Sequence, residues 1–88
     1  MPLTLTLFKS KDCPLCRQME PVFQSVAENF KDKISSNIVD ITENMQQAID
    51  NGVMSIPTVI IARDGNETAR FTGIVSKEKI SQAIEKNK

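Results

Sequence analysis

Two cysteines, Cys13 and Cys16, are separated only by Pro14 and Leu15 in a chain of 88 residues. In a small chain, a pair three residues apart favours redox or metal chemistry over a structural bridge. Closing so short a loop would stabilise the fold by only about 2 kcal/mol on the chain-entropy estimate. The pair therefore predicts a site of thiol chemistry, and an inert disulfide is the plainer alternative.

A metal site is the second alternative for the cysteine pair. A closed zinc site needs four nitrogen or sulfur ligands. The chain has two Cys and no His, so it could complete such a site only if two chains shared one metal. The lack of histidine also excludes Ser-His-Asp and Cys-His catalysis, which need an imidazole base. We therefore expect no metal and no cofactor.

Length and composition limit the classes of protein that remain. Eighty-eight residues fit a single domain over residues 1–88, and the 40% hydrophobic and 25% charged residues are typical of a soluble globular protein. Eleven basic residues balance eleven acidic ones, so neither nucleic acid nor an anionic membrane is an expected partner. The sequence shows no secretion signal and no apolar window near the roughly 20 residues of a membrane span. We expect a cytoplasmic monomer.

The elements that must position the cysteines follow from hydrophobic periodicity. Leucines alternate with threonines at the start of the chain, which predicts a strand over residues 1–8. Apolar residues then recur on one helical face, which predicts a helix from about Pro14 to Phe30. Proline suits the first position of a helix. Cys13 is therefore expected to cap this helix.

The rest of the chain supplies the remaining elements of an α/β fold. We expect a strand at residues 38–41, a helix at 43–50, a hairpin of strands 58–62 and 67–72 around Asp64-Gly65, and a last helix capped by Ser76. A strand–helix–strand crossover makes the first two strands parallel, and the hairpin makes the last two antiparallel. The order predicts one mixed four-stranded sheet with helices on both faces.

The capping position gives the two cysteines different chemistry. A thiolate at Cys13 would accept hydrogen bonds from the free amides of the first turn and would lie at the positive end of the helix dipole. We therefore expect Cys13 to be the more acidic thiol and the nucleophile. Cys16, one helical step away, would attack the resulting mixed disulfide and release the reduced substrate.

Four features in this order resemble the thioredoxin superfamily over essentially the whole chain. They are the cysteine pair, Pro21 in the following helix, the segment Ser55-Ile56-Pro57-Thr58, and Gly73 after the last strand. The resemblance implies the minimal thioredoxin fold, β-α-β-α-β-β-α. It also implies a thiol-disulfide oxidoreductase that reduces protein disulfides and receives electrons from a separate reductase.

The resemblance further implies how a substrate binds. The Ile56–Pro57 peptide bond would be cis, and this loop would lie beside Cys13, where its backbone pairs with an extended substrate segment. The substrate-binding surface would be a shallow apolar patch around Cys13, formed by Pro14, Leu15, Ile56, Pro57, Gly73 and Ile74. Ile56 and Ile74 could equally belong to the core.

Three departures from the family pattern bear on the electron donor. Pro14-Leu15 is more similar to the dipeptide of glutaredoxins, which use glutathione, than to that of thioredoxins. Leu7 occupies the position where many thioredoxins have a buried acid, and Gly73 is not followed by the acidic pair of glutaredoxins. The missing acidic pair favours a thioredoxin-like dithiol route, whereas Pro14 favours the glutaredoxin alternative. A glutathione-dependent glutaredoxin-like enzyme and a non-catalytic binding module of the same fold are the alternatives.

Overall fold

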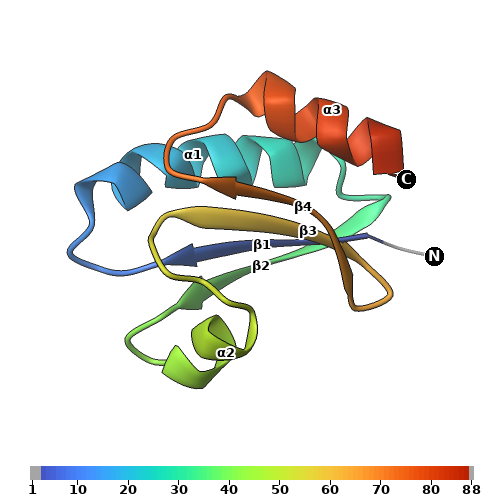
Figure 1. The fold of residues 1–88 in the computed structure, drawn as a ribbon. Helices are drawn as coiled ribbons and strands as arrows, with labels where there is room; N and C mark the ends of the chain where they lie inside the picture. Colours follow the sequence, from blue (N-terminus) through green and yellow to red (C-terminus); the bar gives the residue numbers. More distant parts are fainter. Residues whose placement is uncertain (1–2, 88) are drawn as a thin grey trace.

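The structure is a computed structural model that describes residues 3–87. Its elements are β1 (Leu3–Lys9), α1 (Pro14–Asn29), β2 (Ile34–Asp40), α2 (Met45–Asp50), β3 (Thr58–Arg63), β4 (Asn66–Thr72) and α3 (Lys77–Asn87) (Figure 1). This is the predicted order. Residues 1 and 2 of the predicted first strand lie outside the described residues. None of the helices within 3–87 has the length and apolar character to cross a membrane.

The four strands form one mixed sheet in the order β2-β1-β3-β4. β1 pairs in parallel with β2, whereas the pairs β1–β3 and β3–β4 are antiparallel. Asp64 and Gly65 both have positive φ, 53° and 83°, as a two-residue hairpin turn requires. The predicted crossover and hairpin are therefore confirmed.

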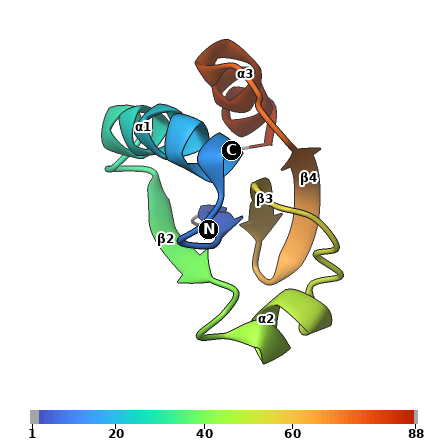
Figure 2. The same cartoon turned by 90° about the vertical axis from the view of Figure 1, so that its left-hand side faces the viewer.

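Helices cover both faces of this sheet, as predicted. Figure 2 shows α1 and α3 on one face and α2 on the other. We call the buried residues of the first face the α1–α3 core; they are Leu3, Leu5, Leu7, Met19, Phe23, Val26, Ile34, Val59, Ile61, Ile80 and Ile84. The buried residues of the second face form the smaller α2 core, which consists of Phe8, Val39, Ala48 and Ile60. Because successive strand residues face opposite sides, neighbours such as Ile60 and Ile61 belong to different cores.

The second strand begins earlier than predicted, and the second helix begins later. β2 starts at Ile34 rather than at residue 38, because Ile34 pairs with Leu3 of β1. The polar residues 35–37 of this edge strand are exposed, so their composition did not signal a strand. α2 starts at Met45 rather than at residue 43, because a hydrogen-bonded turn comes first.

Asp40 organises that turn at the end of β2. Its Oδ1 accepts hydrogen bonds from the backbone amide of Thr42 at 2.9 Å and from the Thr42 hydroxyl at 2.6 Å. The hydrogen bond from the Thr42 hydroxyl is the main cause that holds the pKa of Asp40 below its ordinary value, and the bond from the Thr42 amide is the second. The charges of Lys11 and Lys9 add a smaller effect in the same direction. The carboxylate therefore remains ionised and keeps the turn closed over a wide pH range.

The strand register brings three separate segments to one end of the sheet. Thr58 pairs with Phe8 on one side and with Thr72 on the other. The carboxyl ends of β1 and β4 therefore meet the amino end of β3, at the left of Figure 1. The loop leading to α1, the residue Pro57 and the residue Gly73 all lie at this end. These are the segments that carry the predicted site.

Candidate active site

Cys13 caps the N-terminus of α1. Its backbone is extended, with φ −119° and ψ 103°, and Pro14 begins the helix directly after it. The amide of Cys16 donates a hydrogen bond to Sγ of Cys13 at 3.1 Å, and the amide of Arg17 donates to the Cys13 carbonyl at 3.1 Å. The capping role that the sequence predicted is confirmed. The sulfur of Cys13 therefore takes the place that a serine or aspartate oxygen holds in other helices.

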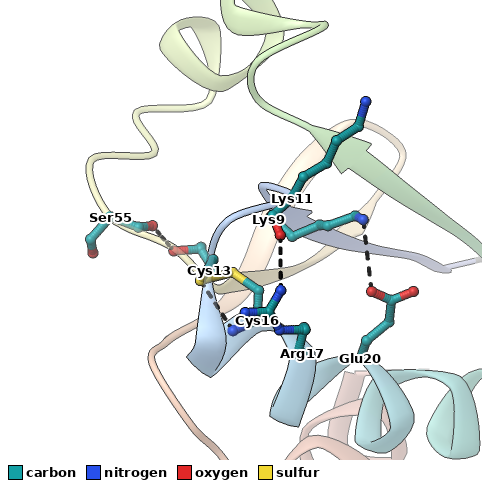
Figure 3. Close-up of a disulfide and its surroundings, with 8 residues drawn as sticks. Lys9, Lys11, Cys13, Cys16, Arg17, Glu20 and Ser55 are labelled. Carbon is teal, nitrogen blue, oxygen red and sulfur yellow. Dashed lines mark hydrogen bonds and ion pairs between the residues drawn. A yellow bond between two sulfur atoms is a disulfide. The ribbon is translucent and has the colours of Figure 1, made fainter.

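The two cysteines form a disulfide at the beginning of α1 (Figure 3). Their Cα atoms lie 5.1 Å apart, within the range of ordinary disulfides. The two partners differ in access to solvent, because Cys13 is half-buried whereas Cys16 is only 1% exposed. A molecule approaching from solvent therefore meets Cys13 first.

The loop before β3 is tied to both neighbouring segments. The Ile56–Pro57 peptide bond is cis. The Thr58 hydroxyl donates to the Ser55 carbonyl at 2.7 Å, and the Gly73 amide donates to the Pro57 carbonyl at 2.8 Å. Gly73 has φ 84°, in the left-handed region that favours glycine. The proline loop and the end of β4 are therefore joined through their backbones.

The six residues of the predicted apolar patch differ in exposure. Pro14 is exposed, Leu15 is 47% exposed and Ile74 is 52% exposed. Ile74 is therefore a surface residue and does not belong to the core. Ile56 is half-buried and packs against the α2 core, so it contributes to both the core and the surface.

Pro57 does not form part of the apolar surface, although the family resemblance implied that it would. Its side chain is buried at the start of β3, next to Thr58, which is only 1% exposed. Gly73, half-buried, has no side chain and binds the loop through its amide. Pro57 and Gly73 can therefore shape the site through the backbone only. Among the six residues, the exposed apolar side chains are those of Pro14, Leu15 and Ile74.

Arg17 is a site residue that the sequence analysis missed. Its Nη1 donates to the carbonyl of Lys11 at 3.3 Å, which links the first turn of α1 to the loop before Cys13 (Figure 3). Its position four residues after Cys13 was the available signal, because residues at this spacing are neighbours along a helix. Lys11 in turn forms an ion pair with Glu43, with Nζ and Oε2 3.4 Å apart. Because both side chains are largely exposed, this pair stabilises the loop little.

An apolar side chain lies at position 7 of β1. Leu7 is completely buried in the α1–α3 core. The position of the family's buried acid is therefore occupied here by a core residue. Among residues 3–87, no cluster of three His, Cys, Asp or Glu side chains could hold a metal ion.

Known proteins resemble the chain over most of its length. The family model described as Thioredoxin matches residues 2–86. The thioredoxin of Methanocaldococcus jannaschii is 33% identical over 82 residues, which cover 93% of this chain and 92% of the relative. The thioredoxin of Chlamydia pneumoniae is 34% identical over 85 residues, which cover 97% and 82%.

A solved structure agrees with these relatives. Thioredoxin 1 of the thermophilic eubacterium Thermosipho africanus superposes with a TM-score of 0.84 at 31% identity, covering 94% of this chain and 91% of that one. Together with the Cys13–Cys16 disulfide, these relatives establish a thioredoxin-like dithiol oxidoreductase, the predicted activity. In general terms, its substrates are protein disulfides and its electron donor is a reductase. The chain belongs to the thioredoxin family.

Proposed function

We propose that Cys13 is the nucleophile and Cys16 the resolving cysteine in the reduction of protein disulfides. In the reduced form, the Cys13 thiolate attacks one sulfur of the substrate disulfide, which forms a mixed disulfide and releases one substrate thiolate. The Cys16 thiolate then attacks Sγ of Cys13 and releases the second substrate thiolate. Two electrons pass to the substrate, and the Cys13–Cys16 disulfide is left behind.

The different exposure of the two cysteines is the observation that carries this assignment. Only Cys13 is accessible enough for a protein substrate, whereas Cys16 is buried directly behind it. The Cys16 amide, which donates to Sγ of Cys13 in the disulfide, would stabilise the thiolate of the reduced form as well. Acidity alone gives a modest gain in rate, because a weaker base is also a weaker nucleophile. The larger gain comes from the high effective concentration of the second sulfur.

The surface around Cys13 fits an extended protein segment. The exposed side chains of Pro14, Leu15 and Ile74 supply apolar contacts on two sides. Ile56, in the loop before β3, would offer its backbone for strand-like pairing, and Pro57 and Gly73 would fix the shape of that loop. Monomeric state, a single domain over residues 1–88 and a cytoplasmic location remain predictions.

A separate thioredoxin reductase is the proposed electron donor. Gly73 is followed by the apolar residues Ile74 and Val75, so this part of the chain offers no carboxylates for binding glutathione. The test is the reduction of insulin disulfides with either thioredoxin reductase and NADPH or glutathione as the only donor. Turnover with the reductase is the expected result. Turnover with glutathione alone would overturn the proposed donor.

The roles of the two cysteines are tested by trapping. A Cys16→Ser variant cannot resolve the intermediate, so it should accumulate a mixed disulfide between Cys13 and the substrate. The matched Cys13→Ser variant should form no such adduct. Mass spectrometry of the trapped protein identifies the bond. A Cys16→Ser variant that reduces insulin at the normal rate would contradict the mechanism.

A further inference from the structure

Arg70 reaches from β4 to the end of α2, outside the cysteine site. Its Nη1 donates to the Gly52 carbonyl at 3.1 Å, and its Nη2 donates to the Asn51 carbonyl. Nε and Nη2 also donate to the two carboxylate oxygens of Glu67, at 2.9 Å and 2.8 Å. One guanidinium therefore binds two backbone carbonyls and one bidentate carboxylate.

These contacts lie just beyond α2, where the backbone amides of residues 51–53 already bind the carbonyls of residues 47–49. The last carbonyls of a helix have no partner within the helix, and positive charge nearby stabilises them. The last turn of α2 contains no basic residue, and the chain turns at Gly52, whose φ is 66°. Arg70 pairs with Ile60 across the sheet and therefore lies on the α2 face. From a different strand, it therefore binds the two carbonyls of the turn that follows α2.

The turn that Arg70 binds leads directly into the loop beside the disulfide. From Gly52 the chain passes Val53, which packs on the α2 core, and Met54, which is 97% exposed, and reaches Ile56 and Pro57. At its far end the loop is bound by the Gly73 amide. β4 therefore holds this loop at both ends, through the side chain of Arg70 and the backbone of Gly73.

The charges of the pair reinforce the contact. The hydrogen bond from Arg70 is the main cause that holds the pKa of Glu67 below its ordinary value, and the same bond raises the pKa of Arg70. Both groups are therefore ionised at neutral pH. The side chains remain 31% and 41% exposed, so solvent screens the charge and the hydrogen-bond geometry is the more important contribution.

We propose that Arg70, oriented by Glu67, is a positioning residue that holds residues 51–57 in the conformation that receives a protein substrate. The inference rests on the proposed role of this loop in binding substrate backbone. A loop that is already ordered loses less conformational entropy on binding. We call the contacts of Arg70 with Asn51, Gly52 and Glu67 the clamp. Loss of the clamp therefore raises KM for protein disulfides. A small disulfide, which needs only Cys13, does not depend on it.

The test compares Arg70→Gln with Arg63→Gln. The control removes an arginine from the same hairpin, at the opposite end of the sheet beside the Asp64-Gly65 turn. For insulin, Arg70→Gln should raise KM by about three- to tenfold with kcat within about twofold, and the rate with dithiobis(nitrobenzoate) should be unchanged. Arg63→Gln should leave all three values near wild type.

Two further variants separate positioning from stability. Arg70→Lys should have a KM for insulin between those of Arg70→Gln and the wild type, because an ammonium cannot bind two carbonyls and both carboxylate oxygens at once. Glu67→Gln keeps the contacts of Arg70 to the carbonyls and should have a smaller effect in the same direction. It also serves as the test if Arg70→Gln does not fold.

Hydrogen exchange gives a readout that does not depend on catalysis. In Arg70→Gln the amides of residues 53–56 should exchange faster while those of α1 keep wild-type rates. Unchanged exchange in this loop, or an unchanged KM for insulin, would overturn the clamp. Equal losses with insulin and the small disulfide would also overturn it, because they would indicate general destabilisation. If the wild-type protein failed to reduce insulin, the proposed function would be contradicted. The hydrogen-exchange rates of the loop would still test whether Arg70 orders it.

Discussion

The two faces of the sheet are built very differently. On one face, the 16-residue α1 and the 11-residue α3 cover the α1–α3 core, whose members are nearly all below 3% exposed. On the other face, the six-residue α2 contributes only Ala48 to the α2 core and leaves Met45 and Ile49 each 62% exposed. The first face is held by apolar burial. The second depends much more on hydrogen bonds such as those of Arg70.

This difference matches the parts of the site that each face carries. Cys13 and Cys16 lie at the start of α1, which packs firmly on the large core. The loop of residues 51–57 follows α2 and packs on the small one. We infer that the sulfur chemistry lies on the more rigid side of the sheet, whereas the segment proposed to bind substrate lies on the side that opens more readily.

Two adjacent residues of β3 give the strongest test of the difference between the two faces. Ile61 is fully buried in the α1–α3 core, and Ile60 is 5% exposed in the α2 core. Ile61→Ala should lower the free energy of unfolding by about 4 kcal/mol, and Ile60→Ala by about 2 to 3 kcal/mol, because the smaller core relaxes more easily around a cavity. Urea denaturation measures both. Equal losses, or a larger loss for Ile60, would refute the distinction between the faces.

A glycine in each helix tests local opening. Ala48→Gly in α2 should cost about 1 to 2 kcal/mol, from helix propensity and lost burial. It should also speed the exchange of amides in residues 45–56. The control, Ala27→Gly in α1, carries a similar propensity cost of about 1 kcal/mol and should leave that segment unchanged. Faster exchange in α1 than in α2 would contradict the account.

Ser76 tests the helix that completes the large core. Its Oγ accepts a hydrogen bond from the Lys79 amide at 3.2 Å, just before α3 begins. Ser76→Ala should therefore lower stability by about 1 kcal/mol in thermal or urea unfolding. The kinetics with insulin should not change, because α3 lies on the face that does not carry the loop. A changed KM for insulin would show that the two faces are coupled more closely.

The smallest predicted effect is the pH dependence of the Arg70–Glu67 pair. The hydrogen bond from Arg70 lowers the pKa of Glu67 in the folded protein, so its contribution is present above the unfolded value of 4.5 and is lost as the pH falls through the folded value. The free energy of unfolding of the wild type should exceed that of Glu67→Gln by no more than about 1 kcal/mol at pH 7. The difference should shrink below pH 4.5. A difference that grows on acidification would have the wrong sign.

Local sequence signals were enough for the elements that carry the cysteines. The Leu–Thr alternation of β1, the apolar face after Pro14 and the turn at Asp64-Gly65 each act over a few residues, and each was correctly predicted. The start of β2 could not be found in this way. Its polar residues become a strand only because Ile34 pairs with Leu3, far away in the sequence.

The same limit applies to the site. Capping by Cys13 is local and followed from the position of Pro14. The burial of Pro57 depends on packing that no short segment encodes. The contact of Arg70 with Asn51 joins residues 19 positions apart, and an arginine in a strand gives no sign of which carbonyl it will reach. Long-range polar contacts were therefore the part that sequence reasoning missed.

The central claim, that Cys13 is the reactive thiol and Cys16 its protected partner, is tested most directly by alkylation of the reduced protein. Substoichiometric iodoacetamide is added over a pH series, and the labelled peptide is identified by mass spectrometry. We predict that Cys13 is labelled first, with a pH midpoint below the roughly 8.5 of a free cysteine, while Cys16 reacts only after unfolding. Labelling of Cys16 first, or a midpoint for Cys13 at or above that value, would contradict the account.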